Sequence, residues 1–198
     1  NSLPPSRLTP SHLPHRGRQK ISHPYNPFTV PAANAAIPVT FSPRKESPMS
    51  QHFPCYSAVF PLLLREHNGK REVLLHRRHN TGYMDGKWDI AGSGHVDEDE
   101  TARQALAREC AEELGIRVRP EDARFAHVCH RLGKEGDRTY YDLYFFVRAY
   151  EGTPAIMEPN KCDGLDWFPL DALPEDMIDF RRLHLHQALT GEMYDELF

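Results

Sequence analysis

The sequence has little cysteine and no long apolar run, and each absence narrows what the chain can be. Four cysteines in 198 residues lie far apart, and none belongs to a C-x-x-C pair. This usage predicts reduced, buried thiols of a cytosolic protein and argues against a disulfide framework. No apolar segment approaches the roughly 20 residues that a membrane span needs. We therefore expect a cytoplasmic protein that does not enter a membrane.

Acidic residues are almost missing from the first 48 residues, which hold six Lys or Arg and one acid, Glu46. Of the chain's 24 basic and 28 acidic residues, 18 and 27 lie in residues 49–198, which gives that part a net charge of −9. Such a charge excludes non-specific binding to nucleic acid or to an anionic membrane, because both need a basic face. It still allows a phosphate substrate that is bound through metal ions.

Regular structure is not expected before Met49, because ten of the 17 prolines lie there. Proline at this density prevents a regular helix, and no hydrophobic period is visible. We interpret residues 1–48 as a Pro-rich leader that is either disordered or a non-native extension. Residues 49–198 are then one domain.

The rest of the chain alternates between strand and helix patterns. Residues 56–79 predict a hairpin with a polar turn at 67–70, and Gly115 suits the residue after a helix over residues 100–114. Further strands are predicted at 123–132, 138–150 and 164–170, and a last helix at 179–189. His127, Cys129 and His130 could suggest zinc, but their apolar surroundings favour a strand with alternate side chains in the core. Together these elements predict a mixed α/β domain.

Carboxylates are concentrated in the stretch from Gly94 to Ile116. On a helix, Glu109, Glu112 and Glu113 have the spacing i, i+3, i+4 and share one arc beside an apolar arc. Like charges placed in this way repel one another, and Mg²⁺ or Mn²⁺ with oxygen ligands would supply the counter-charge. The alternative is a solvated acidic face. Such a face normally carries Lys at i+4, and none follows Glu109 or Glu113 at that distance.

The spacing within this stretch is specific. It reads G-x5-E-x7-R-E-U-x-E-E-x-G-U from Gly94 to Ile116, where U is apolar. This pattern resembles the Nudix box, and the chain from about Tyr56 to Phe198 resembles the Nudix hydrolase family. The resemblance implies an α/β/α sandwich around a mixed β-sheet. It also implies hydrolysis of a phosphoanhydride in a nucleoside diphosphate derivative, with Mg²⁺ or Mn²⁺ as cofactor.

The resemblance also assigns roles inside the box. It implies that Glu109, Glu112 and Glu113 are metal ligands and that the backbone carbonyl of Gly94 is a further ligand. Glu100 and Arg108 would form a pair that orients these carboxylates, which a fixed guanidinium fork can do. The candidate catalytic residues are therefore Glu100, Arg108, Glu109, Glu112 and Glu113.

Outside the box the candidates are weaker. In several Nudix enzymes an acid on a later loop acts as ligand or base, and Glu158 and Asp166 stand where such an acid would lie; a strand-edge acid is an equally good interpretation of each. Arg78 would either contact phosphate or be a solvent-exposed side chain at the end of a strand. Tyr83 and Trp88 would stack on a nucleobase or pack beneath their loop, and packing is the interpretation we favour for both.

The intact box and a minimal domain favour a nucleoside triphosphate pyrophosphohydrolase of the MutT type. One departure argues against a direct transfer of MutT's preference: residues 91–94 read Ala-Gly-Ser-Gly, where many MutT-like members carry Pro-Gly-Gly. The alternatives are an ADP-ribose or dinucleotide pyrophosphatase and, from another class, a non-catalytic Nudix-like ligand-sensing regulator. We expect a small nucleotide as the partner, and family members are often homodimers.

Overall fold

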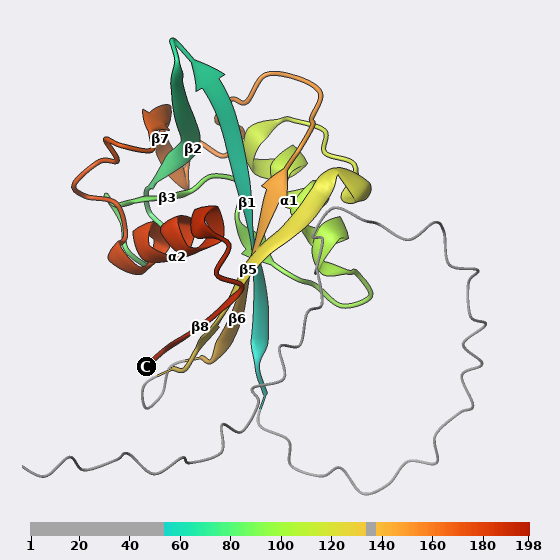
Figure 1. The fold of residues 1–198 in the computed structure, drawn as a ribbon. Coiled ribbons are helices and arrows are strands. Elements are labelled where there is room, and N and C mark those ends of the chain that lie inside the picture. The colour runs from blue at the N-terminus through green and yellow to red at the C-terminus, as the bar shows by residue number, and fades with distance from the viewer. Residues whose placement is uncertain (1–53, 134–137) are drawn as a thin grey trace, which may run out of the picture. The chain divides into compact units, whose positions relative to one another are not determined.

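The computed structural model of the chain describes residues 54–133 and 138–198 (Figure 1). The leader predicted at residues 1–48 lies outside this part. Within the described residues the chain forms eight strands, two α-helices and one 3-10 turn, η1. Their bounds are β1 Tyr56–His67, β2 Lys70–Arg78, β3 Trp88–Ile90, β4 Gly94–His95, α1 Ala102–Leu114, η1 Pro120–Asp122, β5 Ala123–Arg131, β6 Tyr140–Val147, β7 Cys162–Pro169, α2 Asp179–Thr190 and β8 Tyr194–Leu197.

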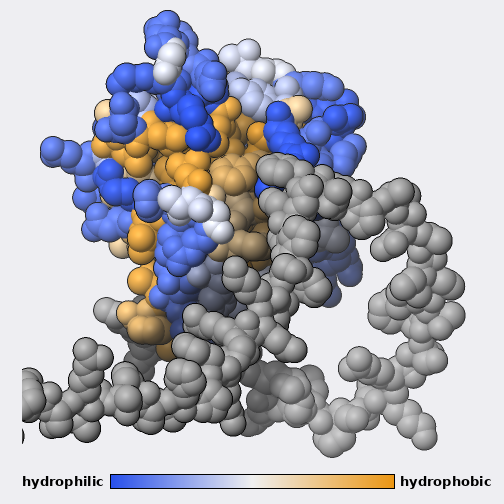
Figure 2. All heavy atoms as spheres, viewed as in Figure 1, coloured by the Kyte–Doolittle hydropathy of each residue, from blue (hydrophilic) through white to orange (hydrophobic). Residues whose placement is uncertain are grey.

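The predicted hairpin is confirmed, because β1 and β2 pair antiparallel around Asn68 and Gly69. Both turn residues have positive φ, 50° and 74°, as the two central residues of a tight I′ hairpin turn require. Strands follow the order β3-β2-β1-β6-β5-β8, with β4 beside β1 and β7 beside β2. The β1–β6 and β5–β8 pairs are parallel, so the sheet is mixed. Figure 2 shows hydrophilic residues covering the tip of the hairpin.

The strands diverge into two groups that share β1. Residues 56–63 of β1 pair with β6, and residues 58–59 also pair with β4. Only residues 64–67 pair with β2, which itself pairs with β3 and β7. The first half of β1 is therefore separated from the second half of β2, and this separation leaves room for a cavity.

The two helices cover opposite faces of the sheet (Figure 1). Along β1, Val59 and Leu63 join the apolar cluster that contains the buried residues of α1. The intervening Phe60 and Leu62 join the cluster that contains Leu185 of α2. This alternation is what a strand between two helical layers needs. The α/β/α sandwich is confirmed.

Several details differ from the sequence prediction. Strands β3, β4 and β8 were not predicted, because two to four residues are too few to show a period.

In β5, His127 and Cys129 are fully buried, as the strand interpretation requires. All four cysteines are free and lie in the described part, but Cys55 is exposed, which contradicts the prediction that all are buried. No helix of residues 54–133 or 138–198 is long and apolar enough to cross a membrane.

Capping fixes where α1 begins. Thr101 is the N-cap, with its side chain accepting from the backbone N–H of Gln104, while the Gln104 side chain accepts from the backbone N–H of Thr101 at 2.8 Å. The helix ends at Gly115, whose φ of 67° lies in the left-handed region. The predicted start at Glu100 was thus two residues early, because this reciprocal pair places Glu100 outside the helix.

Replacement of this cap should weaken the fold measurably. We expect Thr101→Ala to lower the free energy of unfolding by about 1 kcal/mol, because an orphan N–H group of the first turn loses its acceptor. Urea denaturation followed by circular dichroism measures this loss. Thr101→Ser keeps a hydroxyl acceptor and should retain most of the stability. An alanine variant with an unchanged midpoint would contradict this assignment of the cap.

Candidate active site

Arg108, on α1, gathers three glutamates around one guanidinium group. Its Nη2 and Nε donate to the two carboxylate oxygens of Glu100 at 2.7 and 3.2 Å. Its Nη1 donates to Glu109 at 2.7 Å and to Glu112 at 3.2 Å. A further bond from Nη2 to the carbonyl of His95, at 3.0 Å, ties the helix to β4. These bonds lower the pKa of Glu100 and offset the repulsion between the carboxylates.

Glu109 lies against the backbone of β4. A Cβ atom placed on Gly94 would collide with the Glu109 carboxylate, so only glycine allows this approach. Burial raises the pKa of Glu109, although the hydrogen bond from Arg108 acts in the opposite direction. The structure therefore brings together the glycine and the glutamate that the sequence predicted to share a metal.

Glu113 points away from Arg108 and into a cavity. Its Oε2 is buried and has no hydrogen-bond partner among the described residues; the nearest ring nitrogen, Nδ1 of His76, is 3.7 Å away. Burial, together with the charges of Glu109 and Glu158, raises the pKa of Glu113 to about 8. Burial also lowers the pKa of His76, which keeps that ring neutral. A buried carboxylate in this environment suits a cation as its partner.

The cavity lies where the two groups of strands diverge and has a volume of about 1050 Å³. The acidic side chains that line it are Glu113, Glu158 and Asp89. Basic side chains line it as well, namely Arg78, Arg131, Arg138, Lys161 and Arg181. A cavity lined by both carboxylates and cationic groups suits a polyanion that is bound together with metal ions.

The candidates outside the box differ in whether they line the cavity. Glu158 lines the cavity and accepts a hydrogen bond from Lys161 at 3.0 Å. Asp166 is exposed, and its carboxylate accepts from the backbone of Trp167, while the preceding Leu165 lines the cavity. Arg78 lines the cavity too, but its guanidinium donates to Tyr83, Thr81 and Asp89 of the protein itself.

Sequence reasoning missed a buried ionic network beneath the cavity. Arg181 of α2, which is 4% exposed, donates to Asp142 of β6 at 2.9 Å and lies 3.3 Å from Asp89 of β3. Burial alone would raise the pKa of Asp142, but Arg181 and Arg131 hold it below its usual range. A signal was present, since an acid inside an apolar strand such as "YYDLYFF" must be paired. The sequence did not indicate its partner.

The three box glutamates do not converge on one point in this structure. Within residues 54–133 and 138–198, no three His, Cys, Asp or Glu side chains surround a common metal position, because Arg108 binds Glu109 and Glu112 while Glu113 faces the cavity. The donor set nevertheless fits a hard divalent cation. It consists of carboxylate oxygens beside a backbone carbonyl, and the buried Oε2 of Glu113 has an unused acceptor.

Known proteins share this fold. The profile of the NUDIX domain matches residues 57–189. A crystal structure of the MutT NUDIX hydrolase from Burkholderia pseudomallei aligns with a TM-score of 0.60 at 26% identity, covering 68% of this chain and 98% of that one. The oxidized purine nucleoside triphosphate hydrolase of Danio rerio is 26% identical over 59% of this chain and 82% of its own length. The NUDIX domain of Shewanella oneidensis NrtR, complexed with ADP ribose, has a TM-score of 0.57 at 18% identity, covering 70% and 88%.

The buried Glu113 should destabilise the metal-free protein at high pH. Its pKa is raised from 4.5 to about 8, so stability is fully present below the lower value and is lost as the pH rises toward the higher one. In EDTA we expect Glu113→Gln to melt about 4 °C above the wild type at pH 9, with a smaller gain at pH 5.5 and almost none below the unfolded pKa of 4.5. Thermal denaturation across this pH range measures it. Glu121→Gln, an exposed control, should show no such trend, and a pH-independent gain for Glu113→Gln would contradict the assignment.

Proposed function

The chain belongs to the Nudix family of hydrolases, and we propose that it is a divalent-cation-dependent pyrophosphohydrolase of nucleoside triphosphates. One observation carries the proposal: Glu113 presents a buried, unpartnered carboxylate oxygen to a cavity that basic side chains also line. An arrangement of this kind suits a pyrophosphate bridged to carboxylates by cations. A solvated acidic surface would bury no such oxygen.

We infer that Mg²⁺, or Mn²⁺ in its place, binds to Glu109, Glu112 and Glu113 together with the backbone carbonyl of Gly94. Such a cation neutralises phosphate oxygens and makes an attacking water more acidic. Arg108, held by Glu100, orients Glu109 and Glu112, as partners of metal ligands commonly do.

The protein's own cationic groups support the substrate assignment. Lys161 is held by Glu158 at 3.0 Å on the cavity wall, close enough to Glu113 for its charge to oppose the rise in the pKa of that carboxyl. A positive group beside the carboxylates favours a chain of phosphates over a single one. The Danio rerio relative is named an oxidized purine nucleoside triphosphate hydrolase. Such nucleotides are therefore the first substrates to test.

A substrate panel tests the proposal. With Mg²⁺, purified protein should release a nucleoside monophosphate and pyrophosphate from 8-oxo-dGTP, dGTP or another triphosphate, and excess EDTA should abolish the release. ADP-ribose and a diadenosine polyphosphate belong in the same panel. We expect Glu112→Gln and Glu113→Gln each to lower kcat by about 100-fold or more.

Glu121→Gln is the matched control, because Glu121 lies in η1, outside the box, with its side chain 68% exposed. It should retain wild-type turnover. Unchanged turnover in both box variants would contradict the proposal. A higher kcat/KM for ADP-ribose than for any triphosphate would show that the substrate class is ADP-ribose and not a nucleoside triphosphate. Tight nucleotide binding without turnover would favour a ligand-sensing regulator.

A further inference from the structure

The loop between β2 and β3 presents two large apolar side chains to the cavity. Tyr83 and Met84 are each 44% exposed, and both line the cavity. Trp88 at the end of the same loop instead packs edge-on against Phe168, with ring centroids 4.7 Å apart. Packing was predicted for both aromatic residues; it is correct for Trp88 and wrong for Tyr83.

The backbone of this loop is strained. Asn80 and Met84 have φ values of 53° and 52°, and Gly82 and Gly86 have values of 75° and 80°. The left-handed conformation is unfavourable for a side chain as long as that of Met84. Such conformations persist where the surroundings hold them in place, and they concentrate at functional sites.

Two sets of hydrogen bonds hold the strained backbone. The Asp85 carboxylate accepts from the backbone N–H groups of Thr81 and Gly82 at 2.9 and 3.0 Å, and it lies 2.6 Å from the Thr81 hydroxyl. In the second set, Nε of Arg78 donates to the carbonyl of Tyr83 at 2.7 Å. The loop is therefore fixed before any ligand arrives.

Ion pairs connect Arg78, which holds the loop, to buried residues of the core. Arg78 donates to Asp89 at 3.2 Å, and Asp89, which is 1% exposed, lies 3.3 Å from Arg181 of α2. Arg181 also donates to Asp142 at 2.9 Å. This chain of alternating charges connects the loop to β3, α2 and β6, so the position of the loop is set by the fold.

We propose that residues 79–87 form a preformed wall on which the nucleobase of the substrate stacks, with the Tyr83 ring as the contact and Asp85 as the positioning residue. The inference rests on the proposed function and extends it from the phosphates to the base. It assigns the phosphate end of the substrate to the glutamates and the base end to this loop.

Tyr83 suits this role better than Phe60, Phe180 and Tyr140, which also line the cavity. The guanidinium of Arg181 lies 3.6 Å from the ring centre of Phe60 and 4.7 Å from that of Phe180. Arg131 lies 4.4 Å from the ring centre of Tyr140, which His95 also contacts. Arg78 backs the Tyr83 ring at 5.3 Å, yet the residue keeps 44% of its surface exposed. A cation behind a ring strengthens the stacking of an aromatic base on its other face.

Steady-state kinetics with 8-oxo-dGTP and dGTP test the wall. We expect Tyr83→Ala to raise KM about tenfold with little change in kcat, because stacking of a base is lost, while Tyr83→Phe keeps the ring and should stay near wild type. The inhibition constant of inorganic pyrophosphate, which has no base, should be unchanged in both variants. Asp85→Ala should raise KM in the same way. In a protein that already carries Asp85→Ala, Tyr83→Ala should raise KM by a smaller factor than it does in the wild type.

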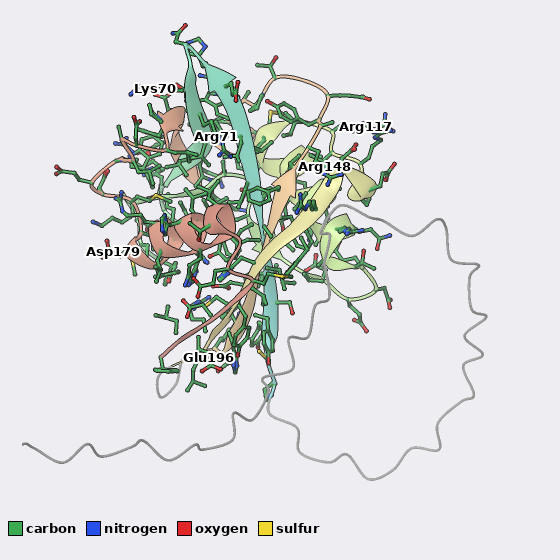
Figure 3. The ribbon with its side chains drawn as sticks, in the orientation of Figure 1. Lys70, Arg71, Arg117, Arg148, Asp179 and Glu196 are labelled. Atoms are coloured by element: carbon green, nitrogen blue, oxygen red, sulfur yellow. The ribbon has the colours of Figure 1, made fainter. Side chains whose placement is uncertain are left out.

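Asp171→Ala is the matched control, because Asp171 is an exposed acid paired with Lys70 at 3.1 Å. Lys70 lies at the tip of the β1–β2 hairpin (Figure 3). Asp171 lies at the surface outside the loop, so its variant should keep the wild-type KM and melting temperature. Wild-type KM in Tyr83→Ala, or a pyrophosphate constant that changes in parallel with KM, would overturn the inference. A wild-type protein without cation-dependent turnover of any nucleotide would overturn the proposed function as well.

Discussion

The attraction between Arg108 and its surrounding carboxylates is the interaction on which the site depends. Glu109, Glu112 and Glu113 occupy one turn of helix, and without a nearby cation their repulsion would oppose that helix. Arg108 neutralises two of them and binds Glu100 and the carbonyl of His95 as well. The same guanidinium thus holds α1 against β4 and fixes the carboxylates, so the fold and the site share one electrostatic origin.

A second ionic arrangement positions the cavity. Asp89 and Asp142 come from strands of different groups, and Arg181 joins them across the divergence of the sheet. Isolated buried carboxylates would be costly, but paired ones fix which elements meet. Because the cavity lies over this pairing, its width is set by a bridge between two strand groups and α2.

Local sequence rules predicted the parts of the fold that depend on neighbouring residues. The polar turn at residues 67–70 marked the hairpin, Gly115 marked the end of α1, and the spacing of the box predicted the glutamates on one face. They could not predict the partners of Asp89 and Asp142, because these contacts join segments far apart in the chain. Nor could they predict that Tyr83 is exposed, since the same loop composition suits a packed ring equally well. Prediction succeeded where the cause was local and failed where it was tertiary.

Two positions that break local rules lie at the cavity. Glu113 buries an acceptor without a partner, and Met84 adopts a left-handed backbone that few side chains tolerate. Elsewhere the alternation of β1 and the caps of α1 follow ordinary preferences. A protein keeps such departures only where they serve something other than stability. These two departures make the cavity a candidate functional site on grounds other than the spacing of the box.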